Sequence, residues 1–143
     1  PAVAAADDRV TALALLFGAG DLSTLLDANL PLPSFVRRPV AWGISAVVSP
    51  LEPLKYIGRV APRPVFLLNG TGDRRMPDRC TRLLQAAASD PKTVRWIDAG
   101  HVHVQDKNFQ RDVLVALRAW LADIGYGAGA GKGGRIGRGS EGF

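Results

Sequence analysis

A single cysteine, Cys80, stands among the 143 residues. One cysteine cannot build a disulfide framework, and such scarcity is typical of a reducing compartment, so we expect a cytoplasmic protein. No uninterrupted apolar run approaches the ~20 residues of a transmembrane helix, so we expect no membrane partner. Aromatic residues make up only 7% of the chain, which predicts an interior built mainly from aliphatic side chains and alanine. One cysteine on a helix face is expected to be a buried structural thiol.

The sequence also lacks a concentrated basic region, although its formal charge is +5. The arginines form short pairs, at 37–38 and at 74–75, and no aromatic residues alternate with them. Nucleic-acid-binding chains usually carry a basic stripe, so we expect no nucleic-acid partner. The start lacks an initiator Met and the features of a signal peptide. We therefore expect these residues to be the middle or end of a longer protein.

Three apolar runs have the character of buried strands. They cover Thr11–Phe17, Val65–Asn69 and Thr93–Ile97, and each is followed by a short loop that contains glycine. Apolar runs without alternation are typical of strands that are buried on both faces of a parallel sheet. The stretch 1–6 precedes the first run and is consistent with the end of a helix. The fold class that we expect is α/β, with a parallel three-stranded sheet.

Helical patterns separate the predicted strands. Pro77 and Asp78 suit a first helical turn, after which Cys80, Leu83, Leu84 and Ala87 fall on one face. From Asp106 onward a second stripe leads to a C-terminal cap at Gly125; its members are Phe109, Val113, Ala116, Leu117, Trp120, Leu121 and Ile124. Strands joined by helices of this length run parallel.

The segment 21–61, between the first two strands, is rich in proline and contains an apolar helical piece at Val40–Val48. Two interpretations stay open for it: short proline-bounded helices that form a cap over the strand ends, or an irregular crossover. Residues 1–125 are expected to form one domain. The glycine-rich, basic segment 126–143 cannot bury enough apolar surface to fold, and we expect a disordered tail.

Asp73 and His101 each follow a predicted strand by a few residues. Reactive groups in parallel sheets gather beyond the C-terminal ends of the strands, and one helix joins these two strands, so we expect the two side chains to meet. A carboxylate that accepts the proton of one imidazole nitrogen leaves the other nitrogen as a general base. This pair is the orienting half of a nucleophilic triad, and the order Asp before His suits one triad fold.

At this point the sequence resembles a known family. Pro-Arg-Pro-Val before an apolar strand, Gly-x-Gly-Asp after it, and Gly-His after the next strand look like the C-terminal half of an α/β-hydrolase. The esterase, dienelactone-hydrolase and peptidase-like branches are the most similar, and the resemblance covers most of 1–124. It implies a partial α/β-hydrolase fold that contains the last three sheet strands, with Asp73 as the triad acid and His101 as the base.

The sequence does not contain the motif that carries the nucleophilic serine in this family. Its Gly-x-Ser-x-Gly elbow and its oxyanion-hole loop would lie upstream of the first predicted strand. The segment around Ser45, Gly-Ile-Ser-Ala-Val, resembles this motif in part but lacks the second glycine and falls in a predicted helix. Both features argue against a nucleophilic role for Ser45. Ser23 and Ser49 have no better context. The resemblance therefore implies that this chain supplies the acid and the base but not the serine.

Other site types have less support. His103 rivals His101, but the family pattern places the base directly after glycine. The pair His101 and His103 with Asp106 lacks a further ligand cluster, so we expect no metal. Gly18–Ser23 approximates a dinucleotide fingerprint, but Ser23 replaces the last glycine, so we expect no cofactor.

Two main functional hypotheses follow from these features. The first is hydrolysis of carboxylic esters or related acyl substrates, of the serine-hydrolase type. The second is a truncated, weakly active or inactive hydrolase scaffold that self-associates. An apolar sheet edge at Thr11–Phe17 recruits another strand, so we expect a symmetric homodimer or a complementing N-terminal half at that edge. A third, weaker hypothesis is a basic binding module that acts through the tail.

Overall fold

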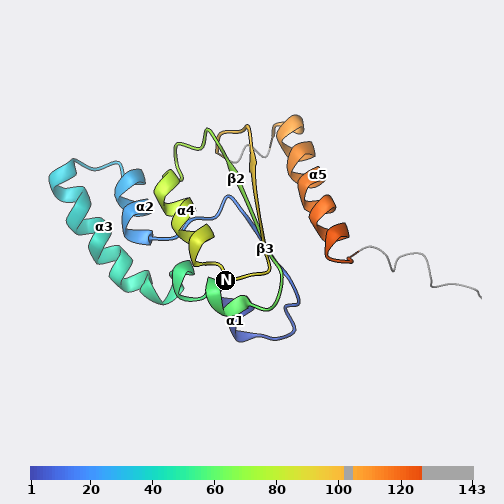
Figure 1. Cartoon of the computed structure of the whole chain (residues 1–143). Coiled ribbons are helices and arrows are strands. Elements are labelled where there is room, and N and C mark those ends of the chain that lie inside the picture. Colours follow the sequence, from blue (N-terminus) through green and yellow to red (C-terminus); the bar gives the residue numbers. More distant parts are fainter. Residues whose placement is uncertain (102–104, 127–143) are drawn as a thin grey trace, which may run out of the picture.

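A computed structural model of the chain describes residues 1–101 and 105–126. The three apolar runs form one parallel sheet, in which the middle strand along the chain is also the middle strand in space (Figure 1). The strands are β1 (Leu13–Leu16), β2 (Val65–Gly70) and β3 (Lys92–Ile97). Leu67 of β2 pairs with Leu15 of β1 and with Val94 of β3. The prediction of an α/β class with a three-stranded parallel sheet is confirmed.

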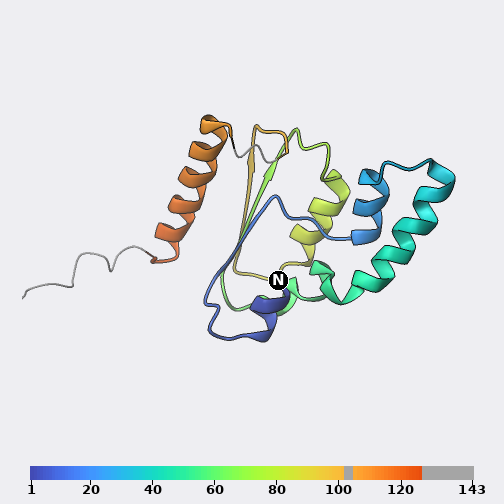
Figure 2. The same ribbon diagram turned by 180° about the vertical axis from the view of Figure 1, so that it is seen from behind.

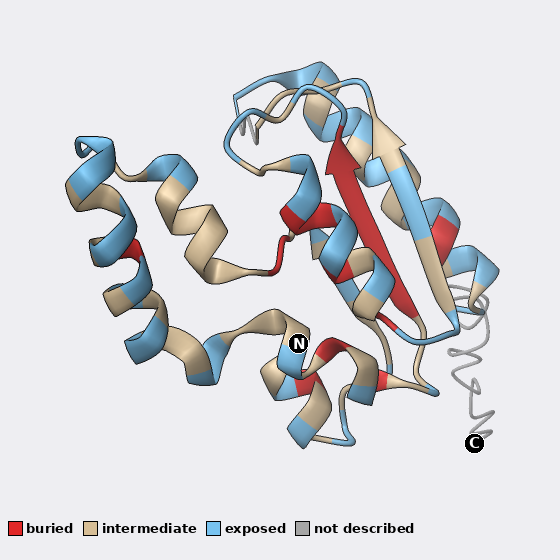
Figure 3. Ribbon diagram, turned by 60° about the vertical axis from the view of Figure 1, so that its left-hand side comes forward, coloured by how far each residue is buried: buried red, intermediate tan, exposed pale blue. Residues whose placement is uncertain are grey.

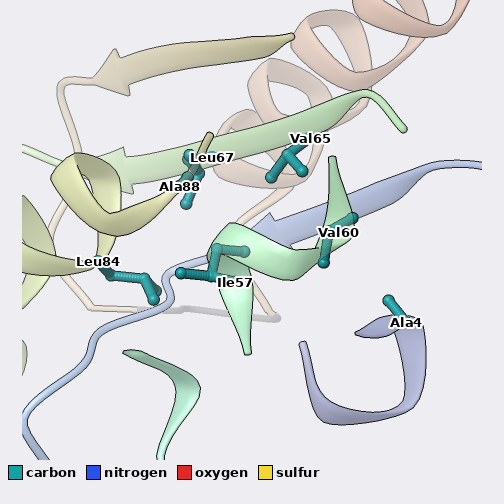
Figure 4. Packing of buried hydrophobic residues seen from close by; sticks show 7 residues of the cluster. All are labelled: Ala4, Ile57, Val60, Val65, Leu67, Leu84 and Ala88. Carbon is teal, nitrogen blue, oxygen red and sulfur yellow. The ribbon is translucent and has the colours of Figure 1, made fainter. Parts of the chain in front are cut away.

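Both faces of β2 are covered, which explains why its sequence does not alternate. All six of its residues are buried. Val65 and Leu67 point to one face, where they pack with residues of the first helix, of a 3-10 turn and of helix α4 (Figure 4). Phe66 and Leu68 point to the other face and pack against Trp120 of helix α5 (Lys107–Asp123). Successive side chains of a strand alternate between its faces, so one apolar strand contributes to two cores.

The helices lie on both sides of the sheet, with α5 opposite α4 (Figures 1 and 2). The insert contains helices α2 and α3, and after α3 three short 3-10 turns lead the chain back to strand β2. Their bounds are η1 (Ser49–Leu51), η2 (Pro53–Lys55) and η3 (Ile57–Val60), and those of the helices are α1 (Ala2–Ala6), α2 (Leu22–Asn29), α3 (Ser34–Val48), α4 (Asp78–Ala87) and α5 (Lys107–Asp123).

The two helices that flank the sheet, α4 and α5, follow their sequence patterns, with one exception in α4. The predicted stripe of α5 packs on the sheet, and Gly125 follows the helix with a φ of +83°. In α4, Cys80 and Leu84 are buried as predicted, but Leu83 is 38% exposed and Thr81 is buried in its place. The face that contacts the core is therefore rotated slightly from the predicted one. It is centred on residues 80, 81 and 84, which are spaced as neighbours on one side of a helix.

β1 differs from its prediction in length and in burial. The predicted strand extends to Phe17, but the regular strand ends at Leu16 because Phe17 has a φ of +56°. Burial on both faces is also expected for β1, whereas Leu16 is 42% exposed and Ala14 is also exposed. The physical reason is position: within the described residues β1 pairs on one side only, with β2.

The insert forms a helical hairpin, α2–α3, that lies beside α4 on the side away from the sheet (Figures 1 and 3). It does not lie over the strand ends. Of the two open interpretations, short proline-bounded helices describe α3 only in part, because Pro33 precedes it but Pro39 lies inside this 15-residue helix. Pro39 removes one helical hydrogen bond, and the carbonyl that it frees, that of Phe35, belongs to an exposed residue that water can reach.

Long-range polar contacts hold the base of the hairpin. The Glu52 carboxylate accepts hydrogen bonds from the backbone N–H groups of Asp21, at 3.0 Å, and Leu22, at 2.8 Å. Asp21 caps α2 in a left-handed conformation, with a φ of +58°. The backbone N–H of Gly20 donates to the Cys80 carbonyl at 3.0 Å, which joins the hairpin base to α4.

Candidate active site

The side chains of Asp73 and His101 meet beyond the C-terminal ends of β2 and β3. Nδ1 of His101 lies 2.9 Å from Oδ2 and 3.1 Å from Oδ1 of Asp73. Because a carboxylate only accepts hydrogen bonds, Nδ1 carries the proton, and in the neutral imidazole Nε2 then keeps the lone pair. The prediction that these two residues are neighbours in space is confirmed by this geometry.

A tight turn holds the Asp73 carboxylate in place. Its Oδ1 accepts hydrogen bonds from the backbone N–H groups of Arg75, at 2.9 Å, and Met76, at 3.1 Å. These bonds form the side-chain-to-backbone turn that aspartate favours. The Asp73 side chain is only 3% exposed, whereas that of His101 is 31% exposed. The acid is therefore fixed and shielded, and the imidazole that it orients faces solvent.

Gly70 lets the His101 loop approach the end of β2. A Cβ atom added at Gly70 would lie 2.3 Å from the Ala99 carbonyl oxygen and 2.9 Å from that of Gly100. Two backbone hydrogen bonds fix the same approach, from Thr71 to the Ile97 carbonyl at 2.9 Å and from Gly72 to the Ala99 carbonyl at 3.0 Å. The close contact between the two loops therefore requires glycine at position 70.

Residues that the sequence analysis did not single out support this region. Asn69, at the end of β2, is buried, and its Nδ2 donates to the Gly18 carbonyl at 3.1 Å. Gln85 of α4 donates to Oδ1 of the same asparagine at 3.3 Å. The sequence signal that could have identified Asn69 is its position as a polar residue at the end of an otherwise apolar strand. Its bonds tie the loop after β1 to the strand that leads to Asp73.

The serines considered as nucleophiles are engaged elsewhere. Ser45 lies in α3, as expected, and its hydroxyl donates to the Trp42 carbonyl at 2.8 Å. The Ser23 hydroxyl donates to Asp21 at 2.8 Å, and Ser49 accepts from Lys55. Among residues 1–101 and 105–126, no serine hydroxyl has a hydrogen bond with His101.

Two of the predictions concern residues outside the described ranges, wholly or in part. His103 and the segment 127–143 of the predicted tail lie outside the described residues. Tyr126, the first residue of that predicted tail, is described, and its backbone N–H donates to the Leu121 carbonyl at 2.8 Å. Within the described ranges, His, Cys, Asp and Glu side chains form no group of three that could hold a metal ion.

Burial and hydrogen bonding shift the pKa values of two groups near the hairpin base. Burial raises the pKa of the Asp21 carboxyl, but hydrogen bonds from Thr24 and Ser23 outweigh it, so the pKa lies below its usual value. Burial raises the pKa of the Cys80 thiol, and the negative charge of Asp21 adds to this effect. Cys80 is fully buried, so its thiol is in the protonated, unreactive form at neutral pH.

Comparisons with known proteins add no assignment. No family model matches the chain. No curated protein matches it in sequence. The described helices include none that is long and apolar enough to cross a membrane.

Proposed function

We propose that Asp73 and His101 are the acid and the base of a hydrolase site of the serine-hydrolase type, which acts on carboxylic esters or related acyl substrates. The observation that carries the proposal is the 2.9 Å contact between His101 Nδ1 and Asp73 Oδ2 at the carboxyl ends of two parallel strands. The resemblance of the surrounding sequence to α/β-hydrolases supports the same roles.

The geometry suits general-base catalysis. With Nδ1 bound to Asp73, the lone pair of Nε2 takes a proton from a hydroxyl group, and the Asp73 carboxylate stabilises the imidazolium that forms. In the proposed reaction the hydroxyl belongs to a serine supplied by a further segment, or, less efficiently, to water. General-base catalysis contributes about 10²–10⁴-fold. Without aligned oxyanion donors the larger electrostatic contribution is missing, so we expect weak hydrolysis by this chain.

The test is the hydrolysis of p-nitrophenyl acetate by the full chain and by Asp73→Asn and His101→Gln. We expect both substitutions to lower the rate to that of the buffer with free imidazole at equal concentration. His103→Gln is the matched control, because it removes the other imidazole of the chain and leaves the proposed pair intact, and it is expected to keep the wild-type rate. Equal rates in the wild type and in the two dyad variants would contradict the proposal.

A second candidate function is that of a hydrolase scaffold that self-associates through β1. The specific observation is the unpaired side of β1. The backbone N–H of Leu13 donates to the carbonyl of Pro64, just before β2, and that of Phe17 donates to the carbonyl of Leu68 in β2. Because N–H groups along a strand point alternately to its two sides, those of Ala14 and Leu16 point away from β2. A hollow of about 440 Å³ lies beside this edge, and Ala12, Ala14, Leu117 and Trp120 are among its lining residues. An unpaired apolar edge favours a further strand.

We expect sedimentation velocity to show a dimer whose population rises with concentration. Leu16→Lys is expected to shift the chain toward the monomer, because an exposed lysine on an edge strand opposes pairing. Leu114→Lys is the matched control, since Leu114 is 51% exposed on α5 and is not among the residues that line the hollow. A concentration-independent monomer for the wild type would contradict edge pairing and would leave the hydrolase proposal as it stands.

A further inference from the structure

The last residue of helix α2, Asn29, forms a hydrogen bond with the turn that follows Asp73. Its Nδ2 atom donates to the Arg75 carbonyl at 2.8 Å and to the Leu25 carbonyl of its own helix at 2.9 Å. A side-chain amide has two N–H hydrogens, so both bonds form at the same time. The first bond joins residues that are 46 positions apart and links the insert hairpin to the candidate site.

Both the backbone N–H and the backbone carbonyl of Arg75 form hydrogen bonds with side chains. Its backbone N–H donates to Asp73 Oδ1 at 2.9 Å, while its carbonyl accepts from Asn29. The same carboxylate receives the proton of His101 Nδ1. A continuous series of hydrogen bonds therefore runs from the end of α2, through one residue of the turn, to the imidazole that faces solvent.

We propose that Asn29 is a positioning residue, which couples the α2–α3 hairpin to the orientation of the Asp73–His101 pair. The proposal rests on the proposed function, because it assigns a role within that site. The hairpin is fixed at its base by Glu52 and by the bond from Gly20 to the Cys80 carbonyl. Asn29 fixes its other end to the acid-bearing turn. The insert hairpin thereby helps to keep the His101 imidazole in one tautomer.

A purely local role for Asn29 makes a different prediction. Its bond to the Leu25 carbonyl satisfies an acceptor in the last turn of α2, as helix ends require. If that were its whole role, substitution would loosen the helix end and leave His101 unchanged. The discriminating measurement must therefore report on His101 and on the turn, and not on overall stability.

The experiment uses the ¹⁵N-labelled full chain at a pH well above the ordinary pKa of a free imidazole. The ring ¹⁵N shifts give the fraction of His101 that carries its proton on Nδ1, and His103→Gln assigns the two imidazoles. We expect the Nδ1–H form to dominate in the wild type and to lose its dominance in Asn29→Ala. The amide exchange rates of Arg75 and Met76 are expected to rise about threefold to tenfold, as loss of one hydrogen bond implies.

Two variants control for shape and for surface position. Asn29→Asp keeps the volume of the side chain but cannot donate to the Arg75 carbonyl at this pH, and we expect it to behave like Asn29→Ala. Asn108→Ala removes an exposed asparagine from α5, and we expect the wild-type tautomer and exchange rates. Circular dichroism checks that each variant folds.

The outcomes separate this inference from the proposed function. Asp73→Asn serves as the reference, and an unchanged His101 tautomer in that variant would contradict the dyad itself. If Asp73→Asn alters the tautomer while both Asn29 variants keep the wild-type values, the dyad stands and the positioning role is wrong. The positioning role is also wrong if Asn108→Ala has an equal effect, or if both Asn29 variants fail to fold, because a structural role would then account for the residue.

Discussion

The ring of Phe17 lies against that of Phe109, with centroids 5.3 Å apart and planes inclined by 44°. Phe17 reaches this contact with a φ of +56°, a left-handed conformation that costs a residue with a side chain about 1–2 kcal/mol. The same ring lies over Gly70, since an added Cβ there would be 3.0 Å from Phe17 Cε1. Phe17 therefore packs the ends of β1 and β2 and the start of α5 together while its backbone is strained.

This conformation predicts an unusual order of stabilities. Phe17→Ala loses the packing of a buried ring, which costs about 3–5 kcal/mol, and keeps the strain. Phe17→Gly loses the same packing but relieves the strain, so we expect it to be more stable than Phe17→Ala by about 1 kcal/mol. The measurement is urea unfolding followed by circular dichroism.

Phe109 provides the matched comparison, because it lies on the other side of the same contact but within helix α5. There the order should reverse, with Phe109→Gly less stable than Phe109→Ala by about 1 kcal/mol. The same order at both positions would show that Phe17 does not occupy a left-handed conformation in solution.

Substitution by alanine is expected to have opposite effects on stability at Gly70 and at Gly43. Gly70→Ala places a methyl group 2.3 Å from the Ala99 carbonyl oxygen, so the loop that carries His101 must move. We expect a loss of about 1–3 kcal/mol, the usual cost of overpacking, and a change in the His101 ring shifts. Gly43→Ala meets no atom within 4 Å in α3 and should stabilise the chain by about 0.5–1 kcal/mol. Thermal unfolding compares the two variants.

The sequence predicts the sheet and the Asp73–His101 pair because the necessary signals are local. β2 is an apolar run that ends in Asn69 and Gly70, and Gly70 is needed where the His101 loop approaches the strand end. Parallel strands bring their carboxyl ends to one edge, so the order of elements is sufficient to place the two side chains near each other. No information from distant residues is required for this step.

The insert could not be predicted in the same way, since contacts far apart in the sequence determine it. The start of α2 depends on Asp21 in a left-handed conformation and on Glu52, which lies 31 residues later. Pro39 is a local signal for a break, but the helix continues through it. The bond from Asn29 to Arg75 joins two exposed polar residues, and no sequence pattern distinguishes them from others on the surface.

Asp21 gives the protein a predictable dependence on acid. Its folded-state pKa lies below the usual value, because hydrogen bonds from Thr24 and Ser23 outweigh the effect of burial. A carboxyl whose pKa is depressed by folding stabilises the folded state above its unfolded pKa of about 3.9. That contribution is lost as the pH falls through the lower, folded-state pKa.

The comparison that isolates this charge is Asp21→Asn, which keeps a good helix cap and tolerates a positive φ. We expect the wild type to be more stable than the variant at pH 6 and the difference to shrink steadily below pH 4. Urea unfolding at several pH values measures it. A difference that is constant between pH 6 and pH 2.5 would show that the Asp21 carboxylate does not contribute through its charge.

Cys80 should be almost inert toward thiol reagents while the chain is folded. Burial raises its pKa, the negative charges of Asp21 and Glu52 raise it further, and Arg79 opposes them only in part. The reactive thiolate is therefore scarce at pH 7.5, and the thiol is also shielded by α4 and the hairpin base. We expect iodoacetamide to modify the folded chain at least about tenfold more slowly than the same chain in guanidinium chloride, as followed by intact mass. Comparable rates in the two conditions would mean that α4 does not keep Cys80 in the core.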